Sequence, residues 1–311
     1  MARRDAIALA TLSAIWGSSY LFIAIGTQSL PPITLVAIRL LIGAIALQIV
    51  LRVRSIPILS APRTLAALAF MGLVNNIIPF TLITWSETPG PQQINSGLAA
   101  VLTAAVPIFT VIIAHFALQD ERFTAPKVIG VLVGFAGVIV LTSPRLSGID
   151  RDHSPLGALA VVGAAMSYAT AATFSRRALS HVPPIVISAT QMTWGTVLLI
   201  PLALLVERPS LAGVPAQAWL AVIWLGLLGS GLAYVLFFGL IQRVGATRTT
   251  IVTYLMPVMA VTLGAIFNAE LVQWTLVAGM ILIVGGAVIV SRRPAPRPAP
   301  AEAVAKPSLT P

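Results

Sequence analysis

The most regular feature of the chain is a succession of long apolar runs separated by polar and charged positions. Each run has about 20 residues, the length that an α-helix needs to cross the hydrocarbon layer of a bilayer. Apolar residues are continuous within a run rather than alternating, which favours helices over the strands of a membrane β-barrel. The pattern predicts an all-α integral membrane protein with ten transmembrane helices, over residues 6–26, 32–51, 64–86, 93–116, 126–143, 155–175, 184–206, 216–241, 248–268 and 273–291.

Helix-breaking residues mark the ends of several runs. Pro31-Pro32 precedes the second run and Pro183-Pro184 precedes the seventh. Proline fits the first turn of a helix but not its interior, so these pairs predict helix starts. Arg3 and Arg4 precede the first run as in a signal peptide, but nine more runs follow and no clear cleavage site of small residues is visible. We therefore expect an uncleaved first helix.

The composition excludes a soluble protein. Of the 311 residues, 58% are apolar and 9% are charged, and the mean hydropathy is +0.96. A soluble domain carries roughly a quarter charged residues. The net charge of +10 is dispersed and forms no basic stripe with interleaved aromatics, so nucleic acid is not an expected partner. We expect a multi-pass protein of the plasma (inner) membrane, whose partners are the lipid bilayer and a small-molecule substrate.

The side chains that most catalytic and metal sites need are scarce. There is no cysteine, and His115, His153 and His181 lie far apart in the sequence, so we expect no metal site and no cofactor. The His-Glu-x-x-His, Gly-x-Ser-x-Gly and phosphate-loop motifs are absent from the sequence. The interiors of the predicted helices contain no acidic residue. The protein is therefore not expected to be an enzyme, nor to couple transport to protons through a buried carboxylate.

The distribution of arginine and lysine predicts the orientation in the membrane. With the N-terminus inside, the outer loops contain only Arg145, Arg151 and Arg208 as basic residues, and the remaining loop and terminal bases are cytoplasmic. This asymmetry places both termini in the cytoplasm. After residue 291 the chain alternates proline with small residues, so residues 292–311 are expected to form a disordered cytoplasmic tail.

The two halves of the chain resemble each other. Prolines, threonines and glycines recur in the same order, and the resulting pairs are Pro31 with Pro183, Arg39 with Gln191, Gly43 with Gly195, Thr103 with Thr253, and Pro107 with Pro257. Each unit has five predicted helices, an odd number, so the second copy must be inverted. Inverted repeats with a binding site at their interface are a common architecture of secondary transporters. We therefore divide the chain into two inverted five-helix repeats, residues 1–150 and 151–291.

Several motifs point to a known superfamily. Trp16-Gly17-Ser18-Ser19, Arg39, and residues 95–100 leading to Pro107 resemble the drug/metabolite transporter superfamily. Asp120-Glu121-Arg122, followed by a glycine-rich fifth helix, resembles its EamA branch. The resemblance covers residues 5–291 and implies ten helices in two inverted repeats and the export of amino acids and other small metabolites. The best-understood architecture of this kind is that of the YddG-type aromatic amino-acid exporters, and the resemblance makes this chain a candidate for that type.

Polar and aromatic residues inside the predicted helices are the candidate substrate site. Such groups are costly in lipid and should face the bundle interior or an aqueous path. The third helix carries one polar and aromatic stripe, and deep aromatic residues of other helices form the second component of a cavity. The candidate substrate-binding residues are Trp16, Ser19, Tyr20, Arg39, Asn75, Asn76, Phe80, Thr84, Tyr168, Gln191, Trp194 and Tyr234. Bonding between neighbouring helices is the alternative role for the two asparagines.

Arg39 is the one charge within the interior of a predicted helix. A cation at that depth costs about 3 kcal/mol on insertion scales, so it needs a partner or water. Glu87 and a substrate carboxylate are the candidate partners, and the alternative is that Arg39 extends outward or bonds neighbouring carbonyls. Pro79, Pro107 and Pro257 are candidate hinges, because proline within a helix removes a backbone hydrogen bond and produces a kink.

Glycines of the fifth and tenth predicted helices form faces for close helix packing. Gly130, Gly134 and Gly137 lie on one such face, and Gly279, Gly285 and Gly286 lie on the other. Packing of each helix within its own repeat is the simpler interpretation, and a dimer contact is the alternative. We expect a monomer or a weak homodimer.

Together these features predict a secondary transporter that exports small metabolites by alternating access. Amino acids, aromatic and other neutral ones, are the expected substrates, moved by uncoupled uniport or exchange. Nucleobases, nucleosides or drugs are alternative substrates. A channel-like membrane protein without a transport cycle is the alternative of a different class.

Overall fold

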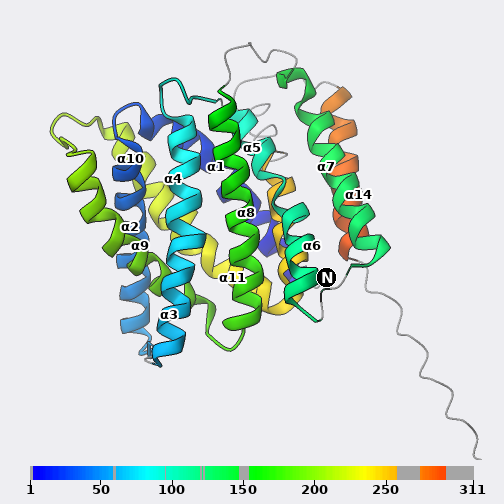
Figure 1. Ribbon diagram of the computed structural model, residues 1–311, viewed down its shortest axis with the longest axis horizontal. Helices are drawn as coiled ribbons and strands as arrows, with labels where there is room; N and C mark the ends of the chain where they lie inside the picture. Colours follow the sequence, from blue (N-terminus) through cyan, green and yellow to red (C-terminus); the bar gives the residue numbers. More distant parts are fainter. Residues whose placement is uncertain are drawn as a thin grey trace, which may run out of the picture.

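The computed structural model describes residues 3–58, 61–94, 96–119, 121, 123–146, 154–257 and 274–291, and the regular secondary structure in these ranges is entirely helical (Figure 1). The elements are α1 (Arg3–Thr27), α2 (Pro32–Val53), α3 (Pro62–Met71), η1 (Gly72–Ile77), α4 (Ile78–Glu87), α5 (Ser96–Thr103), α6 (Val106–Ala117), α7 (Ala125–Leu146), α8 (Pro155–Ala178), α9 (Pro184–Val206), α10 (Ala216–Trp224), η2 (Leu225–Leu232), α11 (Ala233–Val244), α12 (Ala246–Thr250) and α14 (Trp274–Ser291).

The helices agree closely with the apolar runs of the sequence. Within the described residues, 7 continuous helical segments are long and apolar enough to cross a membrane, and α7 and α14 add shorter apolar helices. The predicted helix 184–206 coincides with α9, and 32–51 falls within α2. Most of the predicted helix 248–268 lies outside the described residues, and the cytoplasmic position of the termini stays a prediction.

Proline determines where several helices begin. Pro32, Pro62, Pro155 and Pro184 are each the first residue of a helix, where the missing N–H would have no partner in any case. At the start of α8, the hydroxyl of Ser154 also accepts a hydrogen bond from the Gly157 backbone N–H at 3.4 Å. The helix starts predicted from the proline pairs are therefore found in the structure.

The glycine faces of α7 and α14 pack against each other rather than within separate repeats. The two helices lie side by side at one end of the molecule (Figure 1). A Cβ added at Gly137 would lie 2.9 Å from the Gly279 carbonyl oxygen, and one at Gly286 would lie 2.5 Å from the Gly130 carbonyl oxygen. The expectation that each face packs within its own repeat is thus wrong. These small residues instead join the fifth and tenth predicted helices.

Two membrane-spanning segments change their helical winding at matching places. Residues 62–87 run through α3, η1 and α4, and residues 216–244 run through α10, η2 and α11. In both, the middle part is π-helical. A π-turn adds a residue per turn and changes which side chains and carbonyls face inward, and such turns are frequent at functional sites. Asn75 of η1 lines the cavity described below, and Gly229 and Ser230 of η2 bond two residues that line it.

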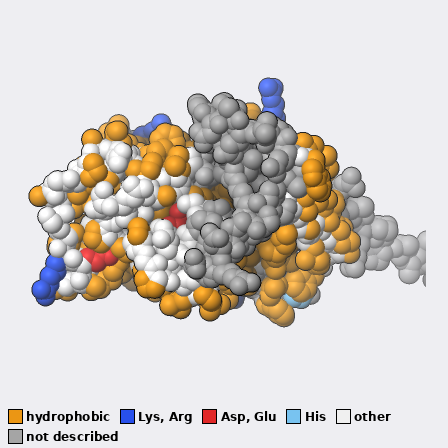
Figure 2. Space-filling view, turned by 90° about the horizontal axis from the view of Figure 1, so that it is seen from above, with side chains coloured by type: hydrophobic (Ala, Val, Ile, Leu, Met, Phe, Trp, Pro, Cys, Tyr) orange, Lys and Arg blue, Asp and Glu red, His pale blue; other side chains and the backbone are white. Residues whose placement is uncertain are grey.

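The outer surface suits a lipid environment. Large apolar side chains project from many helices, among them Phe116, Leu205 and Leu220. Viewed from above, hydrophobic side chains spread over the flanks and few charged side chains are in view (Figure 2). Inside, the described helices bury a continuous apolar core that includes Leu12, Leu40 and Phe238. An apolar exterior around an apolar core is typical of a protein whose solvent is the bilayer.

Candidate functional site

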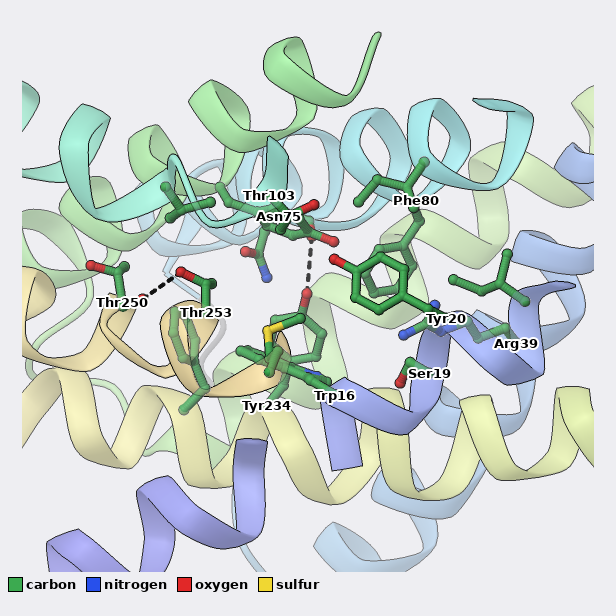
Figure 3. A pocket seen from close by; sticks show the side chains of 16 residues that line it. Trp16, Ser19, Tyr20, Arg39, Asn75, Phe80, Thr103, Tyr234, Thr250 and Thr253 are labelled. Atoms are coloured by element: carbon green, nitrogen blue, oxygen red, sulfur yellow. Dashed lines mark hydrogen bonds between the residues drawn. The ribbon is translucent and has the colours of Figure 1, made fainter. Parts of the chain in front are cut away.

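A cavity of about 70 Å³ lies within the bundle. This is several times the space that one buried water needs. Its walls come from both halves of the chain, and Figure 3 shows the 16 residues that line it. They are Trp16, Ser19, Tyr20, Ile23, Arg39, Asn75, Phe80, Ile83, Thr103, Val106, Tyr168, Tyr234, Phe237, Thr250, Thr253 and Met256.

Arg39 forms the charged end of the cavity. The residue is only 3% exposed, so the side chain does not extend outward to the membrane surface. Its Nε donates a hydrogen bond to the Ser230 hydroxyl of η2 at 2.7 Å. The guanidinium carbon lies 3.8 Å from the ring centroid of Phe80, a cation–π contact. Ser230 and Phe80 therefore hold the guanidinium from one edge and one face.

Glu87 is not the partner of Arg39. Its Oε2 accepts a hydrogen bond from the Ser96 hydroxyl at 2.6 Å, and Glu87 is absent from the cavity wall. Among the described residues, no carboxylate lies within 4.0 Å of Arg39. The structure therefore excludes Glu87 as the partner of Arg39, and the substrate carboxylate stays a prediction.

An aromatic cluster makes up the middle of the cavity. The Trp16 and Tyr234 rings meet edge to face with centroids 5.4 Å apart, and Trp16 lies 5.1 Å from Phe237. The ring centroid of Phe80 lies 6.4 Å from that of Tyr168 and 6.1 Å from that of Tyr234. The Trp16 indole N–H donates to the Gly229 carbonyl of η2 at 2.9 Å. Ring contacts of this kind favour flat apolar or aromatic ligand groups.

The π-segments supply backbone acceptors at the edge of the cavity. The Tyr234 hydroxyl donates to the Asn75 carbonyl of η1 at 3.4 Å (Figure 3). Ser167 donates to the neighbouring Val74 carbonyl at 2.6 Å. Together with the Gly229 carbonyl of η2, these are carbonyls at membrane depth whose partners are side chains. Irregular backbone at this depth is tolerated where it is buried in protein or borders a cavity.

Eight of the twelve predicted binding residues line the cavity, and four do not. Those outside are Asn76, Thr84, Gln191 and Trp194. Asn76, Thr84 and Gln191 are fully buried against other helices, and Trp194 is 37% exposed. Asn76 follows Asn75 directly, and adjacent side chains point about 100° apart around a helix, so the two amides cannot both face the cavity. What each of the twelve does in transport stays a prediction.

The sequence reasoning missed the threonines at the far end of the cavity. Thr103, Thr250 and Thr253 line it, and Figure 3 shows Thr250 and Thr253 at the end opposite Arg39. Each also bonds a carbonyl of its own helical stretch, as Thr253 does with Thr250 at 2.9 Å. The repeat contained the signal, because Thr103 and Thr253 are an aligned pair.

Comparison with known proteins identifies the family. The model of the EamA-like transporter family matches residues 4–143 and 155–292. The chain belongs to the EamA-like transporter family. It is similar to the uncharacterized transporter YoaV of Bacillus subtilis, with 26% identity over 90% of this chain and 94% of the relative. It is also similar to the uncharacterized inner membrane transporter YedA of Escherichia coli K12, with 30% identity over 94% of both chains.

A solved crystal structure has the same fold. It superposes with a TM-score of 0.75 over 93% of this chain and 96% of its own, at 24% sequence identity. The protein is thus a multi-pass membrane transporter and not an enzyme. Its family implies a small-molecule substrate and a lipid environment.

In this EamA-like transporter, the two matched segments share one cavity. Trp16, Arg39 and Phe80 come from the first segment, and Tyr168 and Tyr234 come from the second. A cavity formed jointly by two related halves is where transporters built from repeats bind substrate. The arrangement combines one fixed cation, an aromatic wall and a hydroxyl-bearing end.

Proposed function

We propose that this transporter exports small metabolites that carry a carboxylate and a neutral, preferably aromatic, side chain, and that amino acids of this kind are its substrates. The observation that carries the proposal is Arg39, a buried guanidinium at the end of a cavity, without a carboxylate within 4.0 Å among the described residues. A guanidinium holds a carboxylate through two parallel N–H···O bonds. The substrate carboxylate replaces the missing partner.

The rings of the cavity support the aromatic part of the proposal. With the carboxylate on Arg39, a side chain extending along the cavity meets Trp16, Tyr168 and Tyr234. Stacked and edge-to-face ring pairs contribute about 0.5–1.5 kcal/mol beyond the burial of their area. The threonine hydroxyls at the other end provide hydrogen bonds for a polar tip. This layout supports a neutral aromatic side chain over a charged one.

The transport cycle we propose is alternating access between two inverted five-helix repeats, residues 1–150 and 151–291. Pro79, Pro107 and Pro257 are its hinges. Pro79 is the second residue of α4, directly after η1, and Pro107 is the second residue of α6, after the interruption between α5 and α6. Pro257 is the last described residue before the gap at 258–273. At Pro79 and Pro107 the proline accompanies a change in helical geometry, which supports a pivot there.

Uncoupled uniport or exchange is the energetics that we propose. Proton-driven carriers use intramembrane Asp, Glu or His, and none of these residues is found among the described residues that line the cavity. The substrate then moves down its own gradient or against a second substrate. We further propose that the working unit is a monomer or a weak homodimer.

Counterflow in proteoliposomes tests this function. Vesicles loaded with unlabelled L-phenylalanine are expected to take up labelled L-phenylalanine faster than empty vesicles, because an alternating-access carrier exchanges substrate across the membrane. Loading with adenosine is expected to give no acceleration. Arg52→Gln is the control variant, since this exposed arginine lies on α2 outside the cavity. Acceleration by adenosine alone would make nucleosides the substrates, and flux indifferent to loading would make the protein a channel.

A further inference from the structure

The charges around the cavity do not match a zwitterion. Among the described residues that line it, Arg39 is the one ionised group, and the remaining polar groups are neutral hydroxyls, an amide and an indole N–H. An amino acid brings a carboxylate and an ammonium. The lining residues offer a charged partner to the first group and none to the second.

The acidic side chains that the structure describes are all engaged elsewhere. Asp5 pairs with Arg243 at 2.8 Å, and Glu87 accepts from the Ser96 hydroxyl. Glu121 accepts from the Ala246 and Thr247 backbone N–H groups at the start of α12, at 2.6 and 3.0 Å. Glu207 accepts from the Ile33 and Thr34 N–H groups at the start of α2, at 2.8 and 2.7 Å. These carboxylates stabilise helix starts and bundle ends, and none lines the cavity.

The hydrogen-bond donors of Arg39 that stay available are its two terminal nitrogens, and their arrangement suits a planar anion. Nε is taken by Ser230, and Phe80 covers one face of the guanidinium. Neither terminal nitrogen donates a hydrogen bond to a described residue. A hypothetical Cβ at Gly229 would lie 3.4 Å from Nη2, so this glycine leaves room beside it. The two terminal nitrogens present a parallel pair of N–H donors, the arrangement that a carboxylate accepts.

A buried cation and a neutral surround favour a ligand with one negative charge. The anion offsets the cost of holding Arg39 away from water. An ammonium group entering the same cavity loses its hydration and gains only hydroxyl, carbonyl and ring-face contacts. Its presence on the ligand therefore adds cost without a charged partner.

We infer that the substrate site recognises a carboxylate with an attached apolar or aromatic group and has no requirement for an amino group, so that aromatic monocarboxylates such as 2-oxo and 2-hydroxy acids are substrates alongside amino acids. The inference rests on the proposed function, because it concerns the same cavity and the same arginine. It extends the substrate class from zwitterions to monoanions.

The test is competition in the same proteoliposomes. Uptake of labelled L-phenylalanine is measured against phenylpyruvate, 3-phenyllactate and L-phenylalaninamide, which keep the ring and remove the amino group or the carboxylate. Phenylpyruvate and phenyllactate are expected to inhibit at concentrations no more than about threefold above that of phenylalanine itself. The amide is expected to be about 100-fold weaker, since it keeps only one acceptor oxygen and loses the negative charge that faces Arg39. Vesicles without protein measure passive leakage.

Two variants assign the effect to the guanidinium. Arg39→Gln is expected to abolish both the uptake of phenylalanine and the binding of phenylpyruvate, and Arg52→Gln, the same change on the exposed part of α2, is expected to leave both intact. Intrinsic tryptophan fluorescence gives a second measurement, because Trp16 is the one of the six tryptophans that lies on the described cavity wall, and a signal that is lost in Trp16→Phe reports binding in a variant that no longer transports.

The outcomes separate the inference from the proposed function. If phenylalanine is transported and neither oxo nor hydroxy acid competes, the amino group is required and the inference is wrong while the function stands. If phenylpyruvate competes equally well with Arg39→Gln, the arginine is not the anchor and the inference is again wrong. If neither phenylalanine nor any analogue is transported or bound, the proposed function itself fails.

Discussion

Two helix crossings in this transporter have the same backbone contact and different side chains. In one, α2 crosses η2, and in the other, α9 crosses η1. A Cβ added at Gly226 of η2 would lie 3.0 Å from the Arg39 carbonyl oxygen, and one at Gly72 of η1 would lie 2.9 Å from the Gln191 carbonyl oxygen. Arg39 and Gln191 are the aligned residues of the two repeats. The same backbone contact is therefore made twice.

The side chains at the two crossings differ in their surroundings: one lines the cavity and the other is buried outside it. Arg39 reaches into the cavity and bonds Ser230 of η2. Gln191 stays fully buried outside the cavity, where its Oε1 accepts from Asn75 of η1 at 3.1 Å. Its Nε2, and both side-chain polar atoms of Asn76, have no hydrogen-bond partner among the described residues. The backbone contact is the same in both copies, and only one copy carries Arg39 and Ser230, the pair at the proposed ligand site.

The largest effect is expected from filling the two glycine contacts. Gly226→Ala places a Cβ 2.7 Å from the Ile42 Cβ, and Gly72→Ala places one 3.0 Å from the Trp194 Cβ. Each is expected to lower the free energy of unfolding by about 1–3 kcal/mol, because the helices must separate. Thermal unfolding in detergent measures both variants.

Gly163→Ala is the matched control for these variants. Its Cβ would meet only the Leu82 Cδ1 at 3.7 Å, so it is expected to be neutral or to stabilise by up to about 1 kcal/mol through helix propensity. Loss of stability at Gly226 alone would show that the two crossings are not equivalent.

Much of the fold was predictable because lipid imposes a simple pattern. Continuous apolar runs and terminal prolines determine helix ends almost to the residue, as the coincidence of 184–206 with α9 shows. A buried cation is rare enough in a membrane helix that Arg39 is conspicuous in the sequence. The repeat likewise pairs Thr103 with Thr253, and both line the cavity.

The parts that were not predictable depend on helix phase and on partner choice. The sequence pattern puts Asn75 and Asn76 on one polar stripe, but adjacent residues point about 100° apart around a helix, and only Asn75 lines the cavity. A face of small residues indicates that another helix packs closely on it, but the sequence does not identify that helix. For that reason the contact between α7 and α14 appears only in three dimensions.

A smaller effect is expected from removing the hydroxyl that positions Arg39. Ser230→Ala leaves the arginine in place but deprives its Nε of an acceptor 2.7 Å away. We expect the KM for a carboxylate substrate to rise about 10-fold, the value of one hydrogen bond to a charged group, with little change in maximal rate. Ser188→Ala, which removes a hydroxyl bonded only within α9 at the Pro184 carbonyl, is the control. An equal fall in maximal rate and stability would assign Ser230 a purely structural role.

The smallest change in stability and transport is expected from substitution of Asn76. This substitution tests whether water or substrate binds at the crossing of α9 and η1. Both polar atoms of this fully buried amide lack a partner among the described residues. Leucine has nearly the same size without the desolvation cost, so Asn76→Leu is expected to keep or raise stability, within about 1 kcal/mol, and to preserve transport. Asn75→Leu is the matched comparison, because it removes the bond to Gln191 and alters the cavity wall. It is expected to lose about 1–3 kcal/mol. If instead Asn76→Leu destabilises as much as Asn75→Leu or stops transport, the amide binds water or substrate in the transport cycle, and the two crossings are both functional.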